Sequence, residues 1–267
     1  MANIKFKYSN IQIFMKTKWI FIFFLSVMAF AVGFFIGKKN YENNKKADLF
    51  DNNVSNEELI SHETQQPETE KSNIEIKNLV NIHDIDADIL VELKYASTDN
   101  FTGMVLYEGI TNAYLQPDVA LMLAEAHRYL KTLDTGLRLL VYDAARPVSV
   151  QKIMWERVKD TPYHRYVAHP DRLSLHNFGA AVDLTLADSL GNPLNMGTPF
   201  DHFGRASAIN DEDRLIAQGI ITKQQAKNRQ LLRQLMLHAG FHSISGEWWH
   251  FNACSLQEAK QRYEIWE

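Results

Sequence analysis

The chain has 267 residues, of which 46% are hydrophobic and 22% are charged, and its formal net charge is −4. This composition is typical of a globular protein, and it carries neither the basic footprint of a nucleic-acid-binding protein nor an acidic tail. Because Cys254 is the single cysteine, an intramolecular disulfide framework and a cysteine-based zinc site are both excluded.

An uncharged apolar run at residues 19–37 is long enough to span a bilayer as a helix. A short basic segment, residues 1–18, precedes it, and Lys38 and Lys39 follow. A cleavable signal peptide is the alternative, since Ala29-Phe30-Ala31 could serve as its cleavage site. The apolar run continues through Ile36, so we favour an uncleaved signal anchor. Either way, we expect the remainder in the periplasm or otherwise outside the cytoplasmic membrane, tethered or, after cleavage, secreted.

Residues 38–73 are rich in Asn, Glu, Lys, Asp and Gln. Such a segment buries little apolar surface, and we expect a flexible polar linker. The folded domain is expected at residues 74–267, because no later break in composition and no internal repeat divides this stretch.

Within this domain the patterns predict mixed helices and strands. Alternating apolar residues predict a strand at 85–95, and residues 100–109 read as loop and short strand. Thr222 is the expected cap of a helix that Gly240 ends. The remaining expected elements are helices from 116, at 148–159 and at 255–263, and strands at 137–142, 180–186 and 248–252. Without a regular βαβ repeat, this order favours the α+β class.

His176 and Asp183 form the first candidate pair for chemistry. They are seven residues apart, so an unbroken strand would direct them to opposite faces. Gly179 between them permits a bend, with His176 in the entering loop and Asp183 on the strand. In isolation this spacing is weak, and a core histidine with a capping aspartate is then the favoured interpretation.

A second pair, Glu247 and His250, brackets two tryptophans. A buried carboxylate is costly unless it is paired or lies near a metal. With His250 as a third ligand beside the first pair, two imidazoles and one carboxylate can hold one Zn²⁺ and leave a position for water. Glu247 would stay outside the ligand set and take a proton from that water. This set of residues is typical of a zinc hydrolase.

Arg146 follows the predicted strand at 137–142. An arginine there can hydrogen-bond the oxyanion of a tetrahedral intermediate. A structural pair with Asp143 is an equal alternative at this point. His238 and His242 could mimic helical zinc ligands, but Gly240 between them is expected to end the helix.

Four stretches together resemble the D-alanyl-D-alanine dipeptidases, the VanX-like members of the zinc D,D-peptidase family. The resemblance covers essentially the whole domain from about Leu79. The stretches are Leu93 to Gly103 (LKYASTDNFTG), Tyr142 to Pro147 (YDAARP), Ser174 to Asp183 (SLHNFGAAVD) and Glu247 to His250 (EWWH).

The resemblance implies a role for each candidate residue. His176, Asp183 and His250 would bind one zinc per chain, Glu247 would be the catalytic base, and Arg146 would stabilise the oxyanion. It also implies a compact α+β domain of the hedgehog and D,D-peptidase type, with a central antiparallel sheet and zinc in a cleft. The implied substrate is a free dipeptide of D-configured residues, for which Asp143, Ser174 and Tyr95 are candidate contacts.

The sequence therefore predicts a membrane-anchored zinc dipeptidase that hydrolyses D-alanyl-D-alanine. A D,D-carboxypeptidase trimming peptidoglycan stems on the same fold is the nearest alternative, and would need an open groove. A non-catalytic wall-binding module is a third possibility. The presence of all five expected catalytic and ligand residues argues against it.

Overall fold

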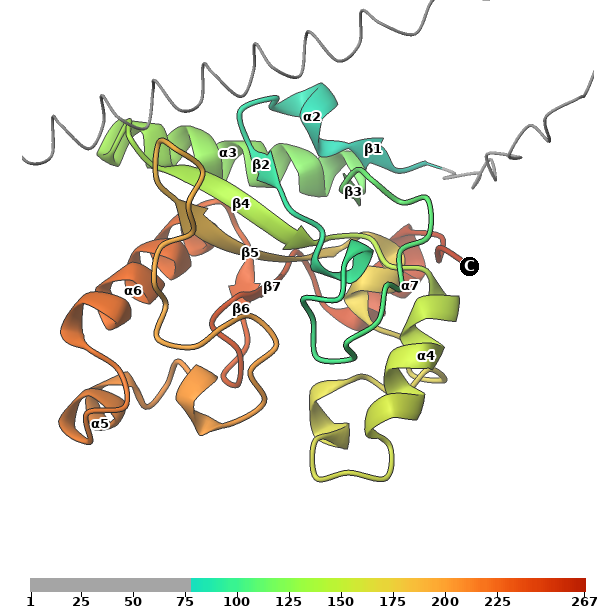
Figure 1. Cartoon of the computed structure of the whole chain (residues 1–267). Helices are drawn as coiled ribbons and strands as arrows, with labels where there is room; N and C mark the ends of the chain where they lie inside the picture. Colours follow the sequence, from blue (N-terminus) through green and yellow to red (C-terminus); the bar gives the residue numbers. More distant parts are fainter. Residues whose placement is uncertain (1–77) are drawn as a thin grey trace, which may run out of the picture. The chain divides into compact units, whose positions relative to one another are not determined.

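A five-stranded sheet lies at the centre of residues 78–267, the part of the chain that the computed structural model describes (Figure 1). Its strand order is β2 (Leu90–Val91), β4 (Arg138–Asp143), β5 (Ala181–Ala187), β7 (His250–Asn252) and β6 (His242–Ser243). Neighbouring strands are antiparallel except β2 and β4, which are parallel. The α+β class is confirmed, but the expected antiparallel sheet is corrected to a mixed one. The chain between β2 and β4 crosses over through a helix, as a parallel pair requires.

The two faces of the sheet carry different kinds of residue. Side chains alternate between faces along a strand, and Val182, Leu184 and Leu186 of β5 belong to the main hydrophobic core. On that side, α3 (Pro117–Leu133) and α6 (Lys223–His238) pack against each other and against β4 and β5. The intervening residues of β5, including Asp183, therefore face the opposite side.

The predicted starts of the two long helices are confirmed. Pro117 lies in the first turn of α3, where its missing N–H removes no helical hydrogen bond. Thr222 caps α6 in a reciprocal arrangement with Gln225, in which each side chain accepts a hydrogen bond from the other's backbone N–H. Gly240 follows the end of α6 with φ of 90°. An L side chain is strained in this backbone conformation, so glycine is the residue that suits it.

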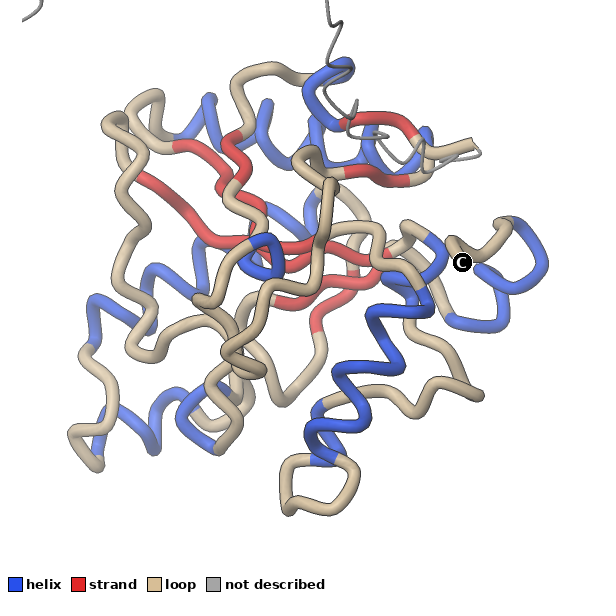
Figure 2. Tube along the Cα trace, turned by 45° about the vertical axis from the view of Figure 1, so that its right-hand side comes forward, coloured by secondary structure: helices blue, strands red, loops and turns tan. Residues whose placement is uncertain are grey.

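Shorter elements complete the described residues. Figure 2 shows the strands of the five-stranded sheet at the centre of this domain, with helices and long loops around them. The remaining elements are β1 (Val80–Asn81), α2 (Ile82–Ile85), η1 (Lys94–Ala96), β3 (Tyr114–Leu115), α4 (Val148–Val158), η2 (His164–Tyr166), η3 (Leu175–Phe178), η4 (Arg205–Ser207), α5 (Glu212–Ala217) and α7 (Leu256–Arg262). β1 and β3 pair with each other as a separate antiparallel ladder.

The predicted strand at 85–95 is wrong over most of its length. Asn81 caps the short helix α2 by accepting a hydrogen bond from the backbone N–H of His83, and the backbone N–H of Asp86 closes its end on Ile82. This capping overrides the apolar alternation at Ile85, and the side chain of Asp86 then accepts a hydrogen bond from the backbone N–H of Asp88 in a turn. The short helix η1 takes residues 94–96, so only Leu90–Val91 joins the sheet. Residues 100–109 form loop without the expected short strand.

The predicted anchor at 19–37 and linker at 38–73 lie outside the described residues. Among residues 78–267, no helix has the length and apolar character needed to cross a membrane.

Candidate active site

Asp183 and His250 are brought together by strand pairing. Asp183 of β5 lies directly opposite His250 of β7 in the antiparallel register, so their side chains project from the same face of the sheet. Their neighbours in the same register, Val182 and Phe251, point to the opposite face and enter the core. The register that buries these two apolar side chains therefore also fixes the two polar ones as neighbours.

His176 reaches the same place from the short helix η3, which precedes β5. Ser174 caps η3 by accepting a hydrogen bond from the backbone N–H of His176. Gly179 ends it in the left-handed region with φ of 64°, and a Cβ there would lie 2.7 Å from a methyl of Leu79. The bend that the sequence predicts at Gly179 is confirmed, and it turns His176 toward Asp183.

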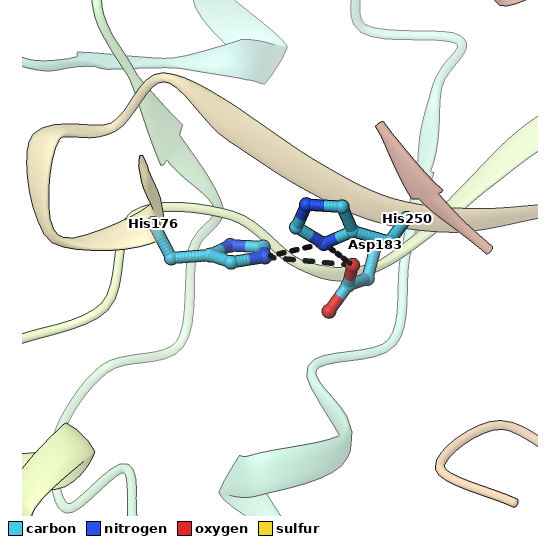
Figure 3. A group of neighbouring side chains, drawn as sticks. All are labelled: His176, Asp183 and His250. Atoms are coloured by element: carbon cyan, nitrogen blue, oxygen red, sulfur yellow. Dashed lines mark hydrogen bonds and ion pairs between the residues drawn. The ribbon is translucent and has the colours of Figure 1, made fainter. Parts of the chain in front are cut away.

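The three side chains converge on one point, as Figure 3 shows. Nε2 of His176 lies 3.2 Å from Nδ1 of His250. Oδ1 of Asp183 lies 2.9 Å from the same Nδ1 and 3.4 Å from Nε2 of His176. A tetrahedral zinc with bonds of ~2.0–2.1 Å needs its ligand atoms about 3.3 Å apart. The triangle has the dimensions of one face of such a site.

The outward-facing nitrogens support this fit. Nδ1 of His176 lies 2.6 Å from the carbonyl oxygen of Ala144, which only accepts, so Nδ1 carries the proton. Nε2 of His250 lies 2.8 Å from Oδ1 of Asn252 and donates to it. Both imidazoles therefore present an unprotonated nitrogen to the triangle. Such hydrogen bonds behind a histidine orient it as a metal ligand.

Asp183 is held in its ionised form. Burial by itself raises the pKa of this carboxyl group, but the charges and hydrogen bonds of His176 and His250 in their protonated forms outweigh burial and lower the pKa well below its usual range. With neutral imidazoles, a bound zinc would supply the positive charge in their place. Ionised carboxylate is the form that binds zinc.

Glu247 lines the same cavity as the three converging residues. Burial, together with the negative charges of Asp183 and Asp201, raises the pKa of Glu247 to about 7, against the opposing effect of His250. A carboxyl group with a pKa near neutrality is suited to accept and return a proton.

Arg146 enters the cavity from the segment after β4. Its Nε and Nη2 both donate to Oδ2 of Asp143, at 3.0 and 2.5 Å, and its Nη1 donates to Oε1 of Gln151 at 2.9 Å. The guanidinium carbon lies 5.1 Å from the centre of the Tyr95 ring. These contacts fix a cation in the wall of the cavity.

The expected substrate contact by Asp143 is corrected. Its side chain is fully buried and does not line the cavity, because Arg146 covers one carboxylate oxygen and the hydroxyl of Tyr107 donates to the other. Tyr95 and Ser174, the other two candidates, do line the cavity.

One cavity-lining carboxylate was missed by the sequence reasoning, that of Asp201. The hydroxyl of Tyr95 lies 3.1 Å from each of its oxygens. Burial and the nearby charge of Asp183 raise the pKa of Asp201 to about 8. The backbone at Asp201 is left-handed, with φ of 58°, and no local sequence pattern predicts this conformation.

The cavity itself is small, about 210 Å³, below the ~300–1,000 Å³ typical of sites for drug-sized ligands. Three aromatic rings pack together in its wall: Phe203 stacks on Tyr166 at 4.9 Å and lies 4.9 Å from Phe101. A larger cavity of about 700 Å³ shares Phe101 and Asp201 with it but contains none of the three converging residues. The candidate active site is therefore the smaller cavity.

His238 and His242 do not form a second cluster of this kind. His238 stacks on Tyr129 at 3.8 Å, and His242 lies on β6 beyond the end of α6. Within the described residues, the histidines and carboxylates that could hold a metal are His176, Asp183 and His250.

Comparisons with known proteins show the family of the chain. The family model described as D-ala-D-ala dipeptidase matches residues 75–265. The D-alanyl-D-alanine dipeptidase of Escherichia coli is 37% identical over 174 residues, which are 65% of this chain and 83% of the relative. Those of Synechocystis and Enterococcus faecalis are each 31% identical, covering 55% and 60% of this chain and 71% and 83% of the relatives.

Among solved structures, a mutant of the vancomycin-resistance D,D-pentapeptidase VanY in complex with Zn(II) matches with a TM-score of 0.30 and 12% identity, over 58% of this chain and 81% of that one. The assignment rests on the family model, which spans most of the chain. The chain belongs to the D-alanyl-D-alanine dipeptidase family.

Proposed function

We propose that this protein is a zinc-dependent dipeptidase that hydrolyses D-alanyl-D-alanine, with one water, to two molecules of D-alanine. The observation that carries the proposal is the triangle of His176, Asp183 and His250, which has the dimensions of a zinc site and shares one small cavity with Glu247 and Arg146. Family membership supports the same reaction.

Each residue has a role that follows from its chemistry. His176, Asp183 and His250 would hold one Zn²⁺ per chain. When bound, zinc supplies Lewis-acid polarisation and makes water more acidic. Glu247 takes a proton from the attacking water and returns it to the leaving amine. Arg146 donates hydrogen bonds to the oxyanion of the tetrahedral intermediate and stabilises its charge.

The proposed specificity for a free dipeptide rests on the size and charge of the cavity. About 210 Å³ suits a small substrate better than a long peptide. Asp201 and Glu247 supply carboxylates to the lining, and we assign Asp201 as the partner of the substrate ammonium because Glu247 is needed for proton transfer. The ammonium would stabilise the ionised form of Asp201 against burial.

The location is part of the proposal. The apolar run at 19–37 and the polar stretch at 38–73 support a membrane-anchored enzyme with its domain outside the cytoplasmic membrane. Fractionation of cells that produce the full chain tests this placement. Recovery with the membranes is expected, and recovery in the soluble cytoplasmic fraction would refute it.

One assay separates the dipeptidase from its alternatives. The full-length, zinc-loaded protein is offered D-Ala-D-Ala, N-acetyl-D-Ala-D-Ala and a pentapeptide ending in D-Ala-D-Ala. Blocking the amine leaves a buried partner unsatisfied, at a cost of ~1–3 kcal/mol, so the two longer substrates should be at least ~10-fold worse in kcat/KM. Equal rates on the pentapeptide would favour the carboxypeptidase, and no hydrolysis would favour the wall-binding module.

A further inference from the structure

A single loop, residues 195–207, brings Asp201 and Phe203 to the active-site cavity. It lies between β5 and α5. Asp201 and Phe203 line the small cavity, and the ring of Phe200 lies 5.9 Å from that of Tyr95 and 5.5 Å from that of Trp249, two further lining residues. How this loop is held therefore determines where the Asp201 carboxylate stands.

Arg229, on α6, holds the loop at two separate points. Its Nε donates to the carbonyl oxygen of Met196 at 2.6 Å, and its Nη2 donates to that of Ala206 at 2.9 Å. The two carbonyls lie on either side of Asp201 in the sequence. A planar guanidinium has donors in a fixed geometry and can join two acceptors, whereas a lysine ammonium acts as a point charge.

Neighbouring residues of α6 extend this contact. Asn228 donates to the backbone carbonyl of Asn195 at 2.9 Å, and Gln225 donates to the side chain of Asn195 at 3.0 Å. Residues three and four apart lie on one face of a helix, so Gln225, Asn228 and Arg229 together form a docking face for the loop.

The loop approaches this face closely. Gly197 has φ of 88°, and a Cβ there would lie 2.8 Å from a methyl of Ile221 and 3.3 Å from Nη2 of Arg229. A side chain would force the loop away from α6. Glycine at this position therefore permits the short hydrogen bonds of Arg229.

Arg229 is an unusual residue to find in this environment. Its side chain is fully buried, and burial lowers its pKa to about 10 despite the opposing charge of Glu212. The nearest hydrogen-bonded partner of Glu212 is a different arginine, Arg233, at 2.9 Å. A buried cation is costly unless it is hydrogen-bonded. Nε and Nη2 of Arg229 bond to the loop backbone, whereas its buried Nη1 has no hydrogen-bond partner among the described residues.

The Asp201 carboxylate is fixed from its other side by Tyr95, whose hydroxyl is 3.1 Å from both oxygens. Tyr95 orients the carboxylate, and Arg229 fixes the backbone that carries it. We propose that Arg229 is a positioning residue that sets recognition of the substrate's free amine, by clamping the 195–207 loop so that Asp201 faces the cavity. This inference rests on the proposed dipeptidase function.

Two substitutions test the clamp in the full-length, zinc-loaded protein. Arg229→Lys keeps a cation without the fork, and Arg229→Gln removes the charge. We expect KM for D-Ala-D-Ala to rise at least ~10-fold, equivalent to ~1.4 kcal/mol, with kcat within ~3-fold and zinc content unchanged. The preference for D-Ala-D-Ala over its N-acetyl derivative in kcat/KM should fall by about the same factor, because only the free amine uses Asp201.

Arg233→Gln is the matched control. Arg233 lies one turn further along the same helix and pairs with Glu212. Among the described residues, it makes no hydrogen bond to the loop. Neither KM nor the preference for the free amine should change. General loss of stability would lower activity on both substrates equally, so the preference separates positioning from folding.

A folded, zinc-loaded Arg229→Lys or Arg229→Gln enzyme with the wild-type preference overturns the proposal. If both variants fail to fold, Asn228→Ala decides, because it removes a neighbouring clamp bond from a half-buried site. Its preference for the free amine should fall ~3-fold, equivalent to ~0.65 kcal/mol, and an unchanged preference would overturn the clamp. A wild-type protein inactive on D-Ala-D-Ala would overturn the proposed function, and the clamp with it.

Discussion

Arg146 donates two hydrogen bonds to one oxygen of Asp143, from Nε at 3.0 Å and from Nη2 at 2.5 Å. The other oxygen of Asp143 accepts the hydroxyl of Tyr107 at 2.5 Å. Because the aspartate is fully buried and bonded at both oxygens, it cannot turn, and the guanidinium cannot turn with respect to it. The two interpretations that the sequence leaves open for Arg146 are therefore compatible: the residue is both structurally paired and exposed to the cavity.

Asp143→Asn should impair turnover although Asp143 does not line the cavity. The substitution keeps the size of the side chain and removes its charge, so Arg146 loses its ionic partner and its fixed position. Loss of an oxyanion donor costs ~10²–10³ in kcat, and we expect misplacement to cost at least ~10-fold. Steady-state kinetics on zinc-loaded protein measure this effect. Tyr107→Phe, which leaves both Arg146 bonds in place, should lose less. An Asp143→Asn enzyme with normal kcat would contradict the positioning role.

His176→Ala should sharply reduce zinc content. The substitution removes one corner of the ligand triangle and leaves a single imidazole beside Asp183, too few protein ligands for a stable zinc site. Metal analysis after dialysis measures the change. His238→Ala is the control, since His238 stacks on Tyr129 away from the triangle, and it should retain zinc. Undiminished zinc in His176→Ala would refute the ligand assignment.

The three converging residues, His176, Asp183 and His250, could be named from the sequence because each lies in a short segment with a recognisable pattern. Asp183 and His250 are opposite each other through strand register, and Gly179 provides the bend for His176. Each of these features involves a short segment whose residue types reveal its conformation. Strand pairing then brings Asp183 and His250 together.

Asp201 and Arg229 were not accessible in this way. Asp201 meets Tyr95 across 106 positions of the chain, and its left-handed backbone is not encoded by a glycine. Arg229 lies on a helix that the sequence predicts well, but its burial depends on a distant loop, in which the carbonyl oxygen of Met196, 33 residues earlier, accepts its hydrogen bond. Long-range packing decides both positions, and apolar periodicity carries no information about it. The parallel pairing of β2 with β4 was not predicted for the same reason, because it depends on a long crossover connection.

Glu247→Gln should keep its zinc and lose activity. Glutamine preserves the shape of the side chain but cannot accept the proton of the attacking water. General-base catalysis contributes ~10²–10⁴-fold, so kcat should fall at least ~10²-fold while metal content stays normal. Parallel kinetics and metal analysis on one preparation measure both quantities. Near-normal turnover by the zinc-loaded variant would exclude Glu247 as the base.

Asp201→Asn should change how stability depends on pH in the zinc-free protein. Burial and the charge of Asp183 raise the pKa of Asp201 from 3.8 to about 8 in the folded state. Between these values the folded protein keeps a proton that the unfolded chain releases, so this group makes stability fall as pH rises. Asparagine cannot ionise and removes the effect. Thermal unfolding midpoints from pH 5 to pH 8, below and near that folded-state pKa, measure it.

The variant should gain stability relative to wild type as the pH increases, with the larger difference at the alkaline end. Glu247, whose pKa is raised to about 7 in part by the charge of Asp201, contributes a slope of the same sign. Loss of that charge in Asp201→Asn reduces the Glu247 contribution, so the difference between the two curves reports Asp201 together with its effect on Glu247. Zinc-free protein is used because a bound cation would stabilise the ionised carboxylates and reduce the shift. Parallel curves for wild type and Asp201→Asn would show that Asp201 is ionised throughout this range, and would remove the evidence for its burial beside Asp183.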